Sequence, residues 1–212
     1  MSTVNESSKQ GLLFVISAPS GAGKTSLVAA MTRADARLKH SVSYTTRPMR
    51  PGEVDGQHYH FIQKDEFQGM VDRHEFLEHA TVFEYSYGTG QAWVEAELAA
   101  GRDIILEIDW QGAQQIMRKF ACVSIFIMPP NKETLRQRLT NRLQDSQATI
   151  ERRLAGAQTE MSHYVEYEYV VVNDKFDEAL AQLQAIILAQ RCTVLHQQAH
   201  WGTIFQEMIA PK

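Results

Sequence analysis

The residues best suited to chemistry lie near the N-terminus, in the run Ala18-Pro-Ser-Gly-Ala-Gly-Lys-Thr25. The run follows an apolar segment of strand length and opens a helix-favouring stretch, which is the setting of a phosphate-binding P-loop. Gly21 and Gly23 let successive backbone N–H groups turn toward one anion, and the helix N-terminus adds partial positive charge. Lys24 can neutralise the β- and γ-phosphates of a nucleoside triphosphate, and the Thr25 hydroxyl can bind Mg²⁺.

The first position of this motif is Ala18, where the strict pattern has glycine. Alanine adds only a Cβ atom, which an ordinary backbone conformation accommodates. The motif therefore still predicts a triphosphate site. Its expected contacts are Ala18, Pro19, Ser20, Gly21, Ala22, Gly23, Lys24 and Thr25.

The composition limits the classes of protein that need to be considered. Of 212 residues, 44% are hydrophobic and 22% are charged, which fits one globular domain. The formal net charge of −4 lacks the cationic field of a nucleic-acid binder. No apolar run approaches the roughly 18 residues that span a bilayer, and the polar N-terminus does not resemble a signal peptide. We expect a cytoplasmic protein with neither nucleic acid nor membrane as a partner.

Four apolar runs have the length of β-strands and lie at Leu12–Ser17, Ile104–Ile108, Val123–Met128 and Tyr169–Val172. Such continuous runs are typical of strands buried on both faces of a parallel sheet. Helical patterns lie between or after them, at Lys24–Thr32, Ala113–Lys119, Lys132–Leu143, Ile150–Met161 and Asp177–His196. The alternation predicts an α/β fold in which helices flank a mostly parallel sheet.

Two segments interrupt the alternation. Residues 43–101 are polar and rich in turn formers, and the prolines of Arg47-Pro-Met-Arg-Pro-Gly52 exclude a helix interior. The stretch 135–153 carries five arginines, of which Arg136 and Arg138 fit a helix surface. We expect one domain, residues 11–191, with a core of about 11–42, 102–135 and 158–191 and inserts at about 43–101 and 136–157. Residues 1–10 are expected to be a flexible tail, and the sequence assigns no role to a second tail, 192–212.

The kind of nucleotide chemistry follows by elimination. A GTPase needs a base-reading Asn-Lys-x-Asp loop, but Asn131-Lys-Glu-Thr134 ends without the aspartate. An ATP-driven machine needs further domains, for which the chain has no room. A kinase acting on a small phosphorylated acceptor remains. Arg47 and Arg50 support it, because two arginines in a proline-fixed extended stretch can converge on one phosphate.

Several motifs together resemble the guanylate kinase family. They are the P-loop, Thr45-Thr-Arg-x-x-Arg-Pro-Gly-Glu-Val54, Phe76-Leu-Glu-His79, Tyr87-Gly-Thr89 and Ile108-Asp-Trp-Gln-Gly112. Their order and spacing cover about Leu12 to Arg191. The resemblance implies a P-loop core with a GMP-binding insert at 43–101 and a short lid at 136–157. It also implies that the chain uses ATP and Mg²⁺ to phosphorylate GMP, and dGMP, with ATP and GMP as its small-molecule partners.

The resemblance assigns roles to individual residues of this chain. Arg47, Arg50, Tyr59 and Tyr87 would hold the GMP phosphate, and Ser43, Glu78 and Thr89 would read the guanine. Glu107 and Asp109 would lie at the acceptor, with Thr25 and Asp109 binding Mg²⁺ partly through water. Catalysis would depend on Lys24 and the lid arginines, Arg142 and Arg153. Asn173 would lie near the adenine of ATP.

The assignment of Glu78 also has a direct chemical basis. Guanine presents N1–H and its 2-amino group as adjacent donors, which suit a carboxylate that accepts two hydrogen bonds. Adenine presents an unprotonated N1 at the same edge, so a carboxylate there would face a lone pair. A hydrogen bond to a charged group contributes about 1.5–3 kcal/mol, which is enough to discriminate between the two bases.

Two positions depart from the family pattern, and two other functions stay open. Glu107 replaces the usual aspartate, and we expect a contact with the acceptor or an arginine to survive. Leu143 replaces a glycine that commonly follows the lid arginine, which could stiffen the lid. The alternatives are a kinase for another nucleoside monophosphate and a non-catalytic guanylate-kinase-like module that binds proteins. A homo-oligomer is compatible with the sequence, which does not determine the oligomeric state.

Overall fold

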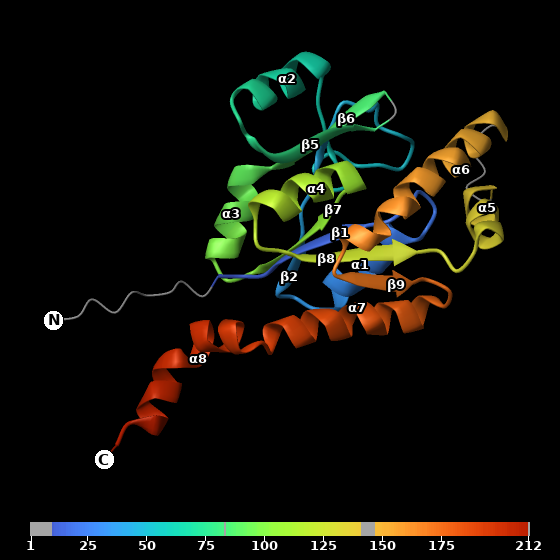
Figure 1. Ribbon diagram of the computed structural model, residues 1–212. Helices are drawn as coiled ribbons and strands as arrows, with labels where there is room; N and C mark the ends of the chain where they lie inside the picture. Colours follow the sequence, from blue (N-terminus) through green and yellow to red (C-terminus); the bar gives the residue numbers. More distant parts are fainter. Residues whose placement is uncertain (1–9, 83, 141–146, 212) are drawn as a thin grey trace.

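The central sheet has five parallel strands. The computed structural model describes residues 10–82, 84–140 and 147–211, without the side chains of 147–150, 152 and 153. The strand order is β2-β7-β1-β8-β9, and every neighbouring pair is parallel (Figure 1). The predicted α/β fold with a parallel sheet is therefore confirmed. The strands are β1 (Leu13–Ser17), β2 (Leu38–His40), β7 (Asp103–Glu107), β8 (Val123–Met128) and β9 (Tyr169–Val172).

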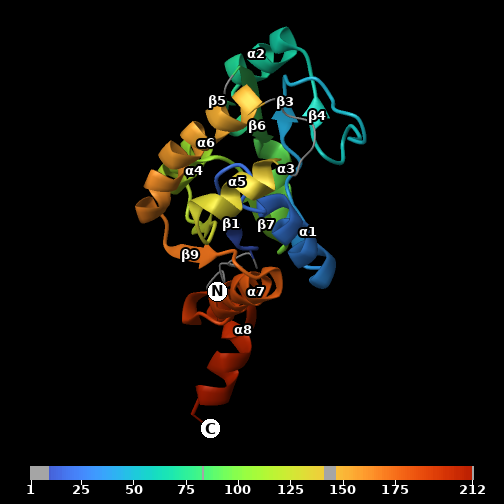
Figure 2. The ribbon, with the colours of Figure 1, turned by 90° about the vertical axis from the view of Figure 1, so that its right-hand side faces the viewer.

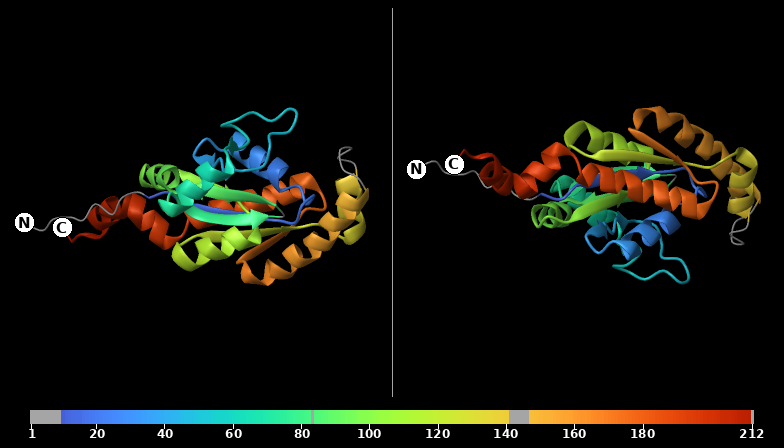
Figure 3. Two further views of the ribbon diagram at one scale, coloured as in Figure 1. Left: turned by 90° about the horizontal axis from the view of Figure 1, so that it is seen from above. Right: turned by 90° about the horizontal axis from the view of Figure 1, so that it is seen from below.

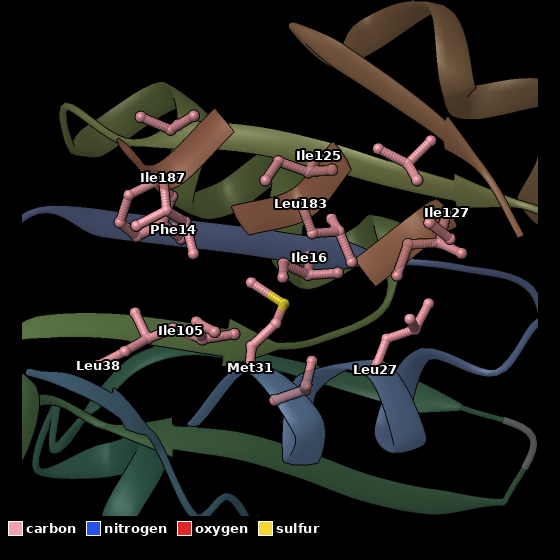
Figure 4. Packing of buried hydrophobic residues seen from close by; sticks show 14 of the residues in the cluster. Phe14, Ile16, Leu27, Met31, Leu38, Ile105, Ile125, Ile127, Leu183 and Ile187 are labelled. Atoms are coloured by element: carbon pink, nitrogen blue, oxygen red, sulfur yellow. The ribbon is translucent and has the colours of Figure 1, made fainter. Parts of the chain in front are cut away.

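Alternate residues of these strands form two separate hydrophobic cores. Phe14 and Ile16 of β1 face α1 (Lys24–Ala34) and α7 (Phe176–Arg191), where Leu27 and Leu183 pack against them (Figure 4). Leu13 and Val15 pack in the second core, which includes residues of α3 (Gln91–Ala99) and α4 (Trp110–Lys119). Views from above and below show α1 and α4 on opposite sides of the sheet (Figure 3). A strand buried on both sides explains why its sequence is a continuous apolar run.

The segment that interrupts the core sequence forms a second sheet, with order β4-β3-β6-β5. Its strands are β3 (Tyr44–Thr45), β4 (His60–Phe61), β5 (Phe76–Val82) and β6 (Tyr85–Gly90), and α2 (Lys64–Asp72) packs on it. This sheet and α2 lie at one end of the molecule, opposite α8 (Val194–Ile209) (Figure 2). Ligands of open α/β sheets bind at the carboxyl ends of the strands. The insert meets this edge at α4, which follows the carboxyl end of β7, because Gly112 of α4 lies against Glu78 of β5.

Two helices follow β8 and lie beside the P-loop. They are α5 (Lys132–Thr140) and α6 (Gln147–Ser162), which a short 3₁₀ turn, η1 (His163–Glu166), connects to β9. Leu135 and Leu139 of α5 pack against Ala157 of α6 in a small separate core. Arg142 and Leu143 lie outside the described residues, as does the side chain of Arg153.

The C-terminal region differs from the prediction. The single helix expected over Asp177–His196 is two helices, because α7 ends at Arg191 and α8 (Val194–Ile209) begins after Thr193. The Thr193 hydroxyl caps α8 by accepting a hydrogen bond from the His196 backbone N–H at 3.4 Å. The segment taken for a tail is therefore largely helical, and it extends away from the core at the end opposite the insert (Figure 2). Among the described residues, no helix has the length and apolar character needed to cross a membrane.

Candidate active site

The P-loop connects β1 to α1 and is built on two glycines in the left-handed region. Gly21 has φ 89° and Gly23 has φ 92°, which an L-residue rarely adopts. Asn173, at the end of β9, lies directly against the loop, since its Nδ2 donates to the Ala22 carbonyl at 2.7 Å. A Cβ at Gly23 would lie 2.5 Å from that Nδ2 atom. The structure thus places Asn173 as a support of the phosphate loop, and its Oδ1 has no hydrogen-bond partner among the described residues.

The lysine and threonine of the loop meet a carboxylate from β7. Lys24 Nζ donates to the Ile108 carbonyl at 3.2 Å and lies 3.9 Å from Glu107 Oε1. The Thr25 hydroxyl donates to the same Glu107 oxygen at 2.5 Å. The other oxygen of Glu107 lies 3.5 Å from His40 Nε2, and burial lowers the pKa of this histidine. Among the described residues Glu107 therefore contacts the P-loop and His40 and no arginine, while the expected contact with the acceptor stays a prediction.

His40 was not identified from the sequence. It ends β2, a strand of only three residues at the edge of the sheet, which is too short to show an alternating pattern. It meets Glu107 because β2 and β7 pair in parallel and both end at the same edge. Only the strand order places these two residues together.

Asp109 begins a helix rather than ending a strand. Strand β7 ends at Glu107, and Asp109 is the N-cap of α4, whose carboxylate accepts from the Gly112 backbone N–H at 3.0 Å. Its second oxygen accepts from the Gln111 side-chain amide at 3.0 Å. The Thr25 hydroxyl in the first turn of α1 and the Asp109 carboxylate are hard oxygen donors, which suit Mg²⁺. The residues present thus fit the metal that the family resemblance implies.

Glu78 and Thr89 form a buried polar pair on the second sheet. They face each other across β5 and β6, and the Thr89 hydroxyl donates to Glu78 Oε1 at 2.6 Å. Only 4% of Glu78 is exposed, and its Oε2 atom lies so close to α4 that a Cβ at Gly112 would come within 2.3 Å of it. Burial, with a further contribution from the Asp109 charge, raises the pKa of Glu78 to about 7. The charge of Lys24 opposes this shift, but among the described residues Glu78 forms no ion pair. A buried carboxylate of this kind is costly, which is typical of a functional site.

Arg47 follows β3 and lies among aromatic rings. Its guanidinium is 5.5 Å from the Tyr59 ring centroid, and the Tyr59 and Tyr87 rings are 5.8 Å apart. Burial raises the pKa of Tyr59 to about 12, so its hydroxyl stays a donor at neutral pH. Arg47 Nη2 donates to Glu53 Oε1 at 2.6 Å, and the Arg50 backbone N–H donates to the other oxygen of Glu53 at 2.7 Å.

The structure thus brings most of the predicted clamp together, while the Arg50 residue is exposed. Ser43 precedes β3 and is half-buried, and its carbonyl accepts from the His60 backbone N–H at 2.9 Å. Glu53 belongs to the motif Thr45–Val54, but the sequence assigned no function to it. Glu53 could have been proposed as the partner of Arg47 because the two opposite charges lie six residues apart in the sequence. That spacing is also common among exposed charges that do not pair, so it is a weak signal.

One arginine expected on a helix surface lies at the P-loop instead. Arg138 donates through Nη2 to the Asn173 carbonyl at 3.0 Å, and its buried Nη1 has no partner among the described residues. Arg136, by contrast, is exposed and pairs with Glu151 at 2.8 Å. The two residues differ because only one face of α5 turns toward the core.

These observations define a class of protein before any comparison is made. A P-loop with its lysine and hydroxyl residue binds the phosphates of a nucleotide. A second sheet holds a carboxylate–hydroxyl pair, which lies against the first turn of α4, and an arginine–tyrosine cluster. The chain is therefore a P-loop protein with places for two ligands.

Comparisons with known proteins name the family. A sequence model of guanylate kinase matches residues 10–190. A guanylate kinase of Methylococcus capsulatus is 55% identical over 201 residues, covering 94% of this chain and 98% of that protein. One of Alkalilimnicola ehrlichii is 56% identical over 189 residues, covering 89% and 93%. The crystal structure of guanylate kinase from Anaplasma phagocytophilum matches with a TM-score of 0.75 at 34% identity, covering 87% and 88%. The chain belongs to the guanylate kinase family.

Proposed function

We propose that this protein transfers the γ-phosphoryl group of ATP to GMP, or to dGMP, and releases ADP and GDP. The observation that carries the proposal is the buried Glu78–Thr89 pair. Glu78 lies against Gly112 in the first turn of α4, which follows the carboxyl end of β7, and β7 pairs in parallel with β1, the strand that leads into the P-loop. A nucleotide kinase needs both a triphosphate cradle and a reader for the acceptor base. This chain has residues suited to each.

Glu78 would select guanine by accepting hydrogen bonds from N1–H and the 2-amino group. Ser43 and Thr89 would complete the reading with their hydroxyl groups. In the absence of the base, Thr89 donates to Glu78 and partly satisfies the buried carboxylate. The cost of burial without a cation is then offset when guanine brings two donors.

The phosphate of GMP would bind to Arg47, Arg50, Tyr59 and Tyr87. In the structure Arg47 gives one nitrogen to Glu53 and another to the Pro48 carbonyl. A guanidinium has five N–H donors, so donors remain for a phosphate. Glu53 holds both Arg47 and the Arg50 backbone, which prepares this loop for the acceptor.

Transfer would depend on positioning and charge. The transition state of phosphoryl transfer spreads negative charge over the equatorial oxygens, which Lys24 and the lid residues Arg142 and Arg153 would stabilise. No residue needs to act as a base, because the second pKa of a phosphate monoester is about 6 and the acceptor is largely ionised. Mg²⁺, held through Thr25 and Asp109, would offset charge on the ATP phosphates when it is bound. We place the reaction in the cytoplasm, where both nucleotides are available.

The acceptor assay decides between this function and its alternatives. ADP release is measured by a coupled assay with ATP and one of GMP, AMP, CMP or UMP. We expect rapid turnover with GMP alone. Turnover with AMP but not GMP would contradict the role of Glu78, and no ADP release with any acceptor would favour a non-catalytic module.

A further inference from the structure

One side chain of α6, the helix that contains the second half of the expected lid and is called the lid helix below, reaches the backbone of the phosphate loop. Glu160 lies in the last turns of α6, and its Oε2 atom accepts a hydrogen bond from the Ser20 backbone N–H at 3.1 Å. The two residues are 140 positions apart in the sequence. Neither the P-loop motif nor the proposed reaction assigns a role to this contact.

A carboxylate is an unexpected group at this place. Glu160 is partly buried, and burial together with the charge of Asp109 raises its pKa, while Lys24 opposes the shift. The residues that influence it are therefore those that surround the proposed triphosphate. A negative side chain beside a polyanion site is electrostatically unfavourable. The hydrogen bond from the Ser20 amide is the contact that offsets this cost.

The second contact between the lid helices and the loop is apolar. Leu135 and Leu139 of α5 lie 3.1 and 3.0 Å from the position that a Cβ would take on Gly21. The same two leucines pack against Ala157 of α6. Two consecutive residues of the P-loop, Ser20 and Gly21, are thus joined to α6, one by a hydrogen bond and one through α5.

The helix that carries Glu160 also carries Arg153. Both lie within α6, which is continuous from Gln147 to Ser162. Their separation of seven positions is about two helical turns, so the two Cα atoms lie on the same face of the helix. A contact that fixes one end of α6 to the P-loop therefore also fixes the distance between the loop and the Cα atom of Arg153.

We propose that Glu160 is a positioning residue, which couples the lid helix to the phosphate loop through the Ser20 amide and so holds Arg153 in register with the bound triphosphate. The proposal rests on the proposed function, in which Arg153 stabilises the transferring phosphoryl group. Glu160 itself would not touch the reacting atoms. Its oxygen acts as a hydrogen-bond acceptor, and its charge is not required.

The first test distinguishes three effects: loss of the hydrogen-bond acceptor at position 160, loss of its charge, and a general disturbance of α6. Steady-state kinetics with varied ATP at saturating GMP are measured for Glu160→Ala, Glu160→Gln and the control Gln158→Ala, an exposed position on the same helix. We expect Glu160→Ala to lower kcat by about 10- to 100-fold with a change in KM for ATP below about threefold, because small misplacements of catalytic groups act on the chemical step. Glu160→Gln, whose amide oxygen can accept the same hydrogen bond, should retain kcat within about threefold, like the control.

Two results would overturn the proposal: a loss in Glu160→Gln equal to that in Glu160→Ala, or a rise in KM with unchanged kcat. Should Glu160→Ala fail to fold, Glu160→Met keeps a similar side-chain length without a strong acceptor, and the same loss in kcat is expected.

A double-mutant cycle with Arg153→Ala tests the coupling itself. If Glu160 acts through Arg153, adding Glu160→Ala to Arg153→Ala should lower kcat by less than a further factor of about three. A double variant whose fold-decrease in kcat equals the product of the two single decreases would refute the coupling. A normal kcat in Arg153→Ala alone would refute the role of that arginine and the coupling with it. The acceptor assay on the unmodified protein tests GMP phosphorylation independently of both.

Discussion

The affinity for GMP should depend on pH through Glu78. Burial raises the pKa of this carboxyl group from 4.5 to about 7 in the free protein. Guanine offers two donors, so it binds to the ionised form and not to the protonated form. About nine-tenths of Glu78 would be ionised at pH 8 and about one-tenth at pH 6. We therefore expect KM for GMP to rise about tenfold between pH 8 and pH 6, equivalent to about 1.4 kcal/mol.

The measurement is kcat/KM for GMP at saturating ATP, from pH 6 to pH 8. Phosphates of both substrates also titrate near pH 6, so the profile of the protein is divided by that of Glu78→Gln, which has no ionisable group at this position. Glu75→Gln is the matched control, because Glu75 is an exposed carboxylate three residues away that pairs with Arg73. The ratio should fall toward pH 6 for the parent and for Glu75→Gln. A ratio that does not vary with pH would refute the assignment of Glu78 as the ionised base reader.

Three further predictions follow from the site. Because the pKa of Glu78 is raised above its unfolded value, its cost to folding grows as the pH rises from about 4.5 to 7. The free energy of unfolding in urea should then be about 1–3 kcal/mol higher for Glu78→Gln than for the parent at pH 8, but not at pH 4. Equal unfolding free energies at pH 8 would contradict this. Lys24→Ala should abolish turnover, by at least about 100-fold, and leave GMP binding by calorimetry unchanged; lost GMP binding would argue against a donor-side role. Gly23→Ala should lower the melting temperature and weaken ATP binding, because its φ is 92° and the new Cβ would meet Asn173 Nδ2 at 2.5 Å; an unchanged ATP affinity would show that the loop adapts.

Local features of the sequence sufficed for the core and the motifs. The four apolar runs predicted four of the five core strands, because a strand buried on both faces must be apolar throughout. The missing strand, β2, has only three residues and lies at the sheet edge, where no such constraint acts. The strands β3 and β4 of the insert have two residues each, too few for any periodic pattern. The break between α7 and α8 was missed because the helical pattern continues across it.

The sequence by itself identified the P-loop and predicted the Arg47 and Arg50 pair, because each consists of neighbouring residues whose chemistry can be recognised in a short motif. The resemblance to the guanylate kinase family predicted Glu78 as the guanine reader. Only the tertiary structure decided what surrounds them. It placed Glu107 against Thr25 and His40, Asn173 beneath Gly23, and Glu160 on the Ser20 amide. These contacts join residues between 67 and 151 positions apart. They arise from the order of strands in the sheet and, for Glu160, from the placement of α6 beside the P-loop, for which no single segment of the chain carries a signal.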